Sequence, residues 1–154
     1  MSLASPELCA FVRKQAPPHY ATPDAPSTWA ELQAWHEDEN ASISMPVFNG
    51  GCEHTIYDSA ETNYAFRAWH DSLHLANNYS FSREDEIKVG LIHMQQARRA
   101  GLSKRDQDTL IADTIGQIEF YYLHKQFVIR QADFVRDVLD NGLLAVLDSG
   151  DKYQ

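Results

Sequence analysis

Most of the chain after about residue 58 repeats apolar residues with the period of an α-helix. The pattern covers three successive stretches, 63–76, 83–99 and 104–140. Each stretch also places ionisable or amide side chains on the stripe that should face inward. Burying such groups alone costs several kcal/mol, so they are usually paired, hydrogen-bonded or bound to something.

The three inward stripes together hold four of the seven histidines of the chain. Their members are Asn63, Arg67, His70 and His74 in the first, Glu86, Gly90, His93 and Ala97 in the second, and Asp113, Gln117, Phe120 and His124 in the third. Three helices that each bring polar groups to an inward face indicate one shared polar centre. A metal ion is the simplest partner for such a centre.

The spacing of His70 and His74 supports a metal site. Two histidines four residues apart on a helix can bind one ion together, as in the HExxH motif. Imidazole and carboxylate ligands suit zinc, iron, manganese, nickel or cobalt, whereas calcium prefers oxygen alone. We therefore predict a divalent transition-metal site with ligands drawn from His70, His74, Glu86, His93, His124 and Asp113. Asp113 and Gln117 have a second interpretation, as groups that orient the ligating imidazoles.

Three residues near these ligands are candidates for catalysis. Glu86 or Asp71 would act as ligand or general base. Asp71 takes the place of the HExxH glutamate, although helical periodicity turns it roughly 80 degrees away from the stripe. Arg67 would orient an anionic substrate, or else would form a salt bridge to Asp113 or Glu86.

Length and composition predict one domain over residues 1–154, because 44% of the residues are apolar and can form a sizeable core. The first 26 residues contain five of the six prolines, so we expect an irregular lead-in there, with a short helix at 6–15. A helix is expected at 28–37, and a small hairpin or an extended loop that crosses the bundle near 43–57. A helical core is expected over 58–148, with a short last turn at 143–147. The predicted fold is an all-α antiparallel helical bundle.

Charge and hydropathy limit the partners. The net charge of −9 and the lack of a basic stripe argue against a nucleic-acid partner. No apolar run of membrane-spanning length and no signal-peptide pattern occurs, so we expect no membrane partner and a cytoplasmic location. The apolar C-terminal residues are the candidate contact of a homo-oligomer: Leu143, Leu144, Val146 and Leu147.

The segment from Ala68 to His74, with adjacent His70 and Asp71, resembles the signature of HD-domain metal-dependent phosphohydrolases. These are all-helical proteins in which adjacent His and Asp residues ligate one or two metals. The resemblance implies His54, His70, Asp71 and Asp113 as ligands. It leaves His93 and His124 for a second ion.

Three functions follow as hypotheses. The first is a metal-dependent hydrolase acting on a small or phosphorylated substrate, with the ion activating a bound water. The second is an iron-dependent oxidoreductase, for which Tyr121 beside the third stripe is the suggestive residue. The third is a non-catalytic structural or interaction protein in which the polar stripes hydrogen-bond to one another.

Overall fold

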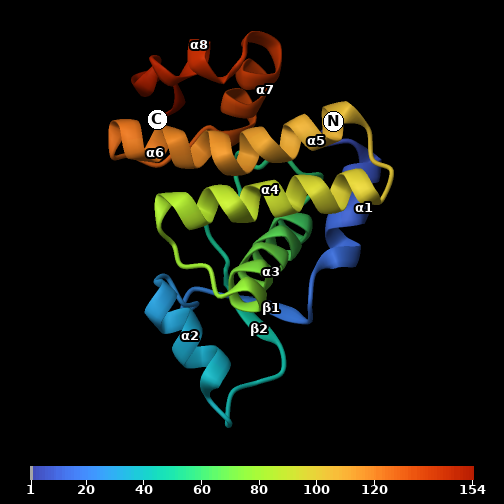
Figure 1. The fold of residues 1–154 in the computed structure, drawn as a ribbon, viewed down its shortest axis with the longest axis vertical. Helices are drawn as coiled ribbons and strands as arrows, with labels where there is room; N and C mark the ends of the chain where they lie inside the picture. The colour runs from blue at the N-terminus through green and yellow to red at the C-terminus, as the bar shows by residue number, and fades with distance from the viewer. Residues whose placement is uncertain (1) are drawn as a thin grey trace.

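The computed structural model describes residues 2–154 and is mainly helical (Figure 1). None of the helices in the described chain is both long and apolar enough to cross a membrane. In chain order the elements are α1 (Pro6–Gln15), β1 (His19–Thr22), α2 (Trp29–Glu37), β2 (Met45–Phe48), α3 (Ala60–Asn77), α4 (Arg83–Arg99), α5 (Lys104–Ile111), η1 (Ala112–Gly116), α6 (Gln117–His124), α7 (Gln131–Asn141), α8 (Leu143–Leu147) and η2 (Gly150–Tyr153).

Hydroxyl side chains fix where the main helices begin. In each case the side-chain oxygen accepts a hydrogen bond from the backbone N–H three residues later, which satisfies one of the free donors of the first turn. The capping residues are Ser5 for α1, Thr28 for α2, Ser59 for α3, Ser82 for α4 and Ser103 for α5. The positions of α3 and α4, which carry the predicted ligands, are thus set locally.

The helices do not form a simple antiparallel bundle, so that part of the predicted fold is not confirmed. In Figure 1, α4 and the α5–η1–α6 run lie side by side and point in opposite directions, with α7 and α8 above them. The axis of α3 is nearly along the line of sight, so α3 crosses beneath α4 rather than lying along it. The end of α3 and the beginning of α4 therefore meet near one crossing.

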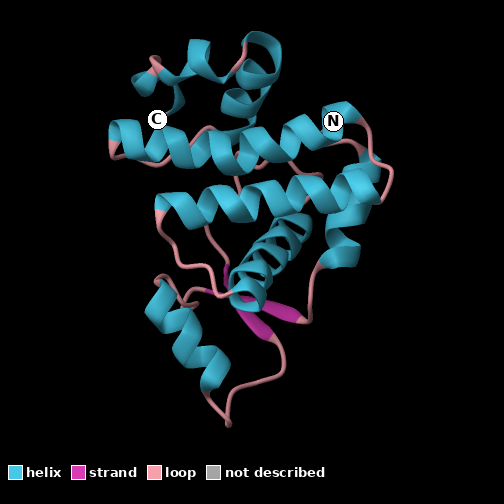
Figure 2. Ribbon diagram, viewed as in Figure 1, coloured by secondary structure: helices cyan, strands magenta, loops and turns pink. Residues whose placement is uncertain are grey.

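The predicted hairpin at 43–57 is wrong. The two strands pair in parallel, with His19 opposite Met45 and Thr22 opposite Phe48, and they lie under α3 (Figure 2). The first strand comes from the lead-in that was expected to be irregular. The Asn-Gly-Gly segment after Phe48 does not connect paired strands. Instead, the carbonyl oxygens of Phe48 and Gly50 accept hydrogen bonds from the side chain of Arg67.

The single long helix predicted for 104–140 is also wrong. Its first part ends at His124, where Lys125 adopts a left-handed conformation (φ 58°), and α7 begins only at Gln131. The carbonyl of Tyr153 accepts hydrogen bonds from the backbone N–H groups of Ile129 and Arg130 (3.0 and 2.9 Å), which holds the intervening loop. This contact with the C-terminus is long-range, so local periodicity could not reveal it.

A π-helix, η1, interrupts the same run between α5 and α6. A π turn contains about one more residue than an α turn, so residues after it are rotated by roughly 100 degrees relative to an uninterrupted helix. The predicted stripe from Asp113 to His124 is therefore split, and its two ends face different parts of the molecule.

Candidate metal centre

His70, His74 and Glu86 converge on one point at the crossing of α3 and α4. The two histidines lie one turn apart on α3, and Glu86 lies in the first turn of α4. The Nε2 atom of His74 is 3.1 Å from Nε2 of His70 and 2.8 Å from Oε1 of Glu86, and Nε2 of His70 is 3.3 Å from Oε2 of Glu86. These residues form a group that could hold a metal ion.

The separations among these nitrogen and oxygen atoms fit a transition metal. Bonds of about 2.0–2.1 Å to nitrogen and oxygen put neighbouring ligands about 2.9 Å apart in an octahedral site and about 3.4 Å apart in a tetrahedral one. The observed separations of 2.8, 3.1 and 3.3 Å match these values. The His74 side chain is fully buried, whereas His70 and Glu86 are 20% and 12% exposed, so the group is open on one side.

The hydrogen bond behind His74 determines which of its nitrogens is free. Nδ1 lies 2.8 Å from the carbonyl oxygen of Tyr79, and because a carbonyl only accepts, Nδ1 carries the proton. In the neutral imidazole, Nε2 then has a lone pair, which points at a carboxylate oxygen and another imidazole nitrogen. The close contact of this nitrogen with the Glu86 carboxylate needs either a proton or a metal ion between the two atoms.

His93 supports His70 from α4. Its Nε2 is 2.8 Å from Nδ1 of His70, and the two rings are parallel with centroids 5.1 Å apart. Phe66 stacks on both rings, and Trp69 contacts His93 edge-on. His93 is fully buried, and its Nδ1 has no hydrogen-bond partner in the described chain. The structure therefore places His93 as a group that orients His70.

The pKa values follow from burial and these contacts. Burial alone would raise the pKa of Glu86, but hydrogen bonds and charge from His70 and His74 outweigh it and lower that pKa to about 2. Burial lowers the pKa of His70, yet the contact with Glu86 raises it overall. The pKa of His93 lies well below its ordinary value because of burial and the nearby imidazoles. Glu86 is thus an anion and His93 a neutral imidazole at neutral pH.

A hollow of about 180 Å³ lies on the open side of the three residues. It is lined by Phe66, His70, Glu86, Asp113, Thr114, Gln117, Ile118, Tyr121 and Phe127. Asp113 belongs to the π-helix, a kind of irregularity that is frequent at functional sites. Burial raises the pKa of its carboxyl to about 6, although Gln117 donates to Oδ1 at 2.7 Å. A carboxyl group that titrates near neutrality therefore faces the same hollow as the candidate ligands.

Gly90 lets α4 approach the π-helix closely. A Cβ atom at this position would lie 2.6 Å from Cγ1 of Ile115 and 2.8 Å from Oγ1 of Thr114. Glycine removes both clashes, so the element that carries Glu86 and His93 packs directly on the element that carries Asp113.

The structure does not bring all the predicted site residues together. His124 lies at the end of α6, with its Nε2 against the carbonyl oxygen of Leu147, away from the three-residue group. Asp71 is half-buried next to His70, but its carboxylate is not part of the group, and burial raises its pKa. His54, which the HD resemblance implied as a ligand, is exposed in a loop. Arg67 lies on the same side of α3 and lines a neighbouring hollow.

Two contributions were missed by the sequence analysis. The carbonyl of Tyr79 orients His74 because α3 ends in a left-handed turn at Asn78 (φ 54°), which folds the chain back over the last turn. The Asn77-Asn78 pair was the available signal, since asparagine tolerates this conformation. Phe127, which no sequence signal marked as a site residue, lies in the loop after α6 and reaches the hollow.

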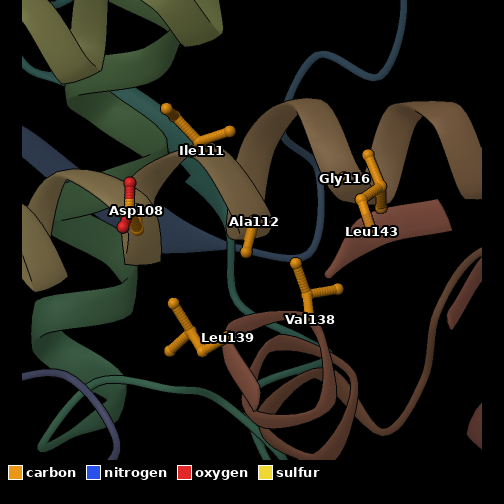
Figure 3. Close-up of a pocket in the computed structure, with 7 residues that line it drawn as sticks. All are labelled: Asp108, Ile111, Ala112, Gly116, Val138, Leu139 and Leu143. Carbon is orange, nitrogen blue, oxygen red and sulfur yellow. The ribbon is translucent and has the colours of Figure 1, made fainter. Parts of the chain in front are cut away.

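A separate hollow of about 200 Å³ lies between the α5–η1 run and helices α7 and α8 (Figure 3). Val138 and Leu139 of α7 face Ala112 of η1 across it. Its one ionisable lining residue, Asp108, is paired with Lys104 at 2.7 Å. This hollow therefore has no group suited to catalysis or metal binding.

Comparison with known proteins gave no relative. No model of a protein family matches the chain, and neither a curated protein nor a solved structure matches it significantly. Function must therefore be inferred from the site itself.

Proposed function

We propose that this protein is a metal-dependent hydrolase that acts on a small substrate bound in the hollow beside His70 and Glu86. The observation that carries the proposal is the convergence of two imidazole nitrogens and a carboxylate, with His74 oriented by a carbonyl so that its free nitrogen points inward. Two histidines and one glutamate also form the ligand set of a well-known type of catalytic zinc site, which leaves a position open for water or substrate.

His70, His74 and Glu86 would hold the divalent ion, which would act as a Lewis acid and would lower the pKa of a bound water toward 7. Asp113 is the residue suited to move the proton, because its carboxyl faces the same hollow and its pKa of about 6 allows it to accept and return a proton near neutral pH. Gln117 holds the carboxyl group in place through Oδ1.

An iron-dependent oxidoreductase is the second candidate. Two histidines and one carboxylate with open positions also form the set that binds iron in many oxygenases. Tyr121 lines the hollow together with His70 and Glu86, where an oxidisable side chain would be close to the ion. The metal that the protein prefers separates this candidate from the hydrolase.

The test begins with metal content. The full chain is purified, stripped with chelator, reconstituted in turn with Zn²⁺, Mn²⁺, Ni²⁺ and Fe²⁺, and analysed by plasma mass spectrometry. We expect about one ion per chain in the parent protein and in His54→Ala, and little in Glu86→Gln or His74→Ala. His54→Ala is the matched control, since it removes an exposed histidine that only the HD ligand set requires.

The activity of the metal-loaded protein then distinguishes a hydrolase from an oxidoreductase. The metal-loaded protein is assayed against small esters and phosphoesters, and Asp113→Asn should keep the ion but lose activity by about 10²-fold or more. A parent protein that binds no ion after reconstitution would overturn the proposal and leave a buried hydrogen-bond network, as in a structural protein. Iron-specific binding with oxygen consumption would favour the oxidoreductase.

A further inference from the structure

The side chain of Arg67 is held by neutral groups. Its Nη1 donates to the carbonyl oxygens of Phe48 and Gly50, each at 2.6 Å. In the amide orientation that satisfies its neighbours, Asn63 accepts at its oxygen from Nε and Nη2 of Arg67, both at 3.2 Å. These contacts fix the guanidinium in position and leave one N–H of Nη2 free.

The positive charge of Arg67 has no direct countercharge. Sequence analysis left open a salt bridge to Asp113 or Glu86, but within residues 2–154 no carboxylate lies at ion-pair distance from this guanidinium. Four of the other seven arginines do form such pairs, for example Arg13 with Asp58 and Arg83 with Glu119. An arginine fixed in place without an acidic partner is suited to bind an anion from outside.

The free side of Arg67 faces a polar hollow of about 160 Å³. The hollow is lined by Asn63, Phe66, Arg67, Asp113, Gln117 and Gln131. Gln131, from the start of α7, has no side-chain hydrogen bond in the described chain, so its amide is available as a second donor.

This hollow adjoins the one beside the metal centre. Phe66, Asp113 and Gln117 line both. Arg67 and the candidate metal ligands His70 and Glu86 therefore line adjacent hollows.

Gly51 lies beside the guanidinium in a backbone conformation that favours glycine. A Cβ atom at Gly51 would lie 3.4 Å from Nη2 of Arg67, and the backbone there has φ of +72°, which favours glycine. The carbonyl oxygens of Phe48 and Gly50 thus hold one side of the guanidinium, and the segment does not cover the other side.

We propose that Arg67 and Gln131 bind an oxyanion of the substrate, a phosphate or a carboxylate, while the bond to be cleaved lies beside His70, His74 and Glu86. That the anion is part of a substrate rests on the proposed function. That Arg67 and Gln131 bind an anion does not depend on it. In a chain with a net charge of −9, a fixed cation at this point is also what allows an acidic molecule to enter the site.

The test measures anion binding to the full, metal-free chain by isothermal titration calorimetry. Inorganic phosphate and acetate are the two probes, and they distinguish a phosphate site from a carboxylate site. We expect one of them to bind the parent protein, and Arg67→Gln and Gln131→Glu each to weaken it at least tenfold. Arg67→Lys, which keeps the charge, should retain part of the affinity.

Two controls keep the result specific. Arg99→Gln removes a charge from the Arg98 and Arg99 surface on α4 and should leave binding unchanged. Gln131→Glu leaves the contacts of Arg67 with residues 48–50 intact, so it reports on the hollow even if Arg67→Gln loosens that segment. Thermal unfolding of each variant checks that it is folded.

The outcomes separate this inference from the proposed function. If the protein takes up metal but neither anion binds, or both variants bind like the parent, the anion site is overturned while the metal centre stands. If both variants lose anion binding in a chain that takes up no metal, the anion site is supported and the hydrolase proposal fails.

Discussion

At the scale of single residues, hydrogen bonds to the second ring nitrogen of His70 and His74 determine the orientation of these candidate ligands. His74 is oriented by the carbonyl of Tyr79, and His70 is oriented by the imidazole of His93. Such partners fix the tautomer and direction of a ligating ring, and their loss typically lowers metal affinity 10- to 100-fold. The two histidines of α3 are therefore pre-arranged for an ion by groups outside the three-residue cluster.

Asp113 provides a prediction at this scale, about stability and pH. The unfolded chain releases the proton of this carboxyl near the ordinary pKa of 3.8, and the folded protein releases it near 6. The folded state thus holds more protons between these values, so the contribution of Asp113 to the unfolding free energy falls as pH rises from about 4 to about 6. Asp113→Asn should gain stability relative to the parent across this window, by at most about 3 kcal/mol.

The measurement is urea unfolding of both metal-free proteins at several pH values from 4 to 7. The comparison cancels the other titrating groups, including Glu86, which acts in the opposite direction because its pKa is lowered. A stability difference that stays constant over the whole range would show that Asp113 is not held with a raised pKa.

At the scale of elements, the site depends on the contact between α4 and the π-helix. Helix α4 carries Glu86 and His93, and η1 carries Asp113 and Thr114. The two meet at Gly90, where there is no room for a side chain. This close approach therefore sets the distance between two of the elements that line the hollow.

Gly90→Ala tests that contact. The added methyl would meet Ile115 and Thr114 at 2.6 and 2.8 Å, so the elements must move apart. We expect a loss of about 1–3 kcal/mol in unfolding free energy, despite the better helix propensity of alanine, together with weaker metal binding. Chemical denaturation and metal titration measure the two effects.

A double-variant cycle gives the control. Ile115→Ala removes the nearer of the two clashing groups, so Gly90→Ala/Ile115→Ala should be more stable than the sum of the two single effects predicts. Additive effects would mean that Gly90 acts through helix propensity or elsewhere, and not through its contact with the π-helix.

At the scale of the whole molecule, a metal ion would tie two consecutive helices to each other and, through α4, to the elements that pack on it. His70 and His74 belong to α3 and Glu86 to α4, and α4 in turn packs on α5 and η1. An ion that binds only the folded chain stabilises it by mass action.

Thermal unfolding should therefore depend on metal. At free metal 100-fold above the dissociation constant, we expect about 2.7 kcal/mol of added stability and a rise of several degrees in Tm, which chelator reverses. Glu86→Gln should show little of this rise, and His54→Ala should show all of it. An equal response in Glu86→Gln and the parent would place the bound ion elsewhere.

The sequence by itself determined the helices that begin and end through local signals. Residues 6–15 and 83–99 were predicted with the bounds that the structure shows, because capping residues and apolar periodicity act within one helix. It also determined the central part of the site: His70 and His74 four residues apart, and Glu86 with His93 on one face of the next helix, since periodicity fixes which side chains share a face.

Only the tertiary structure decided the rest. The π-helix, the parallel pairing of residues 19–22 with 45–48, and the break after His124 all depend on contacts between distant segments. For this reason His124 is separated from the ligands and Arg67 has carbonyl partners in place of a carboxylate. Local periodicity shows which side chains share a face, but it does not show which element that face packs against. The set of predicted ligands could therefore be narrowed to His70, His74 and Glu86 only from the tertiary structure.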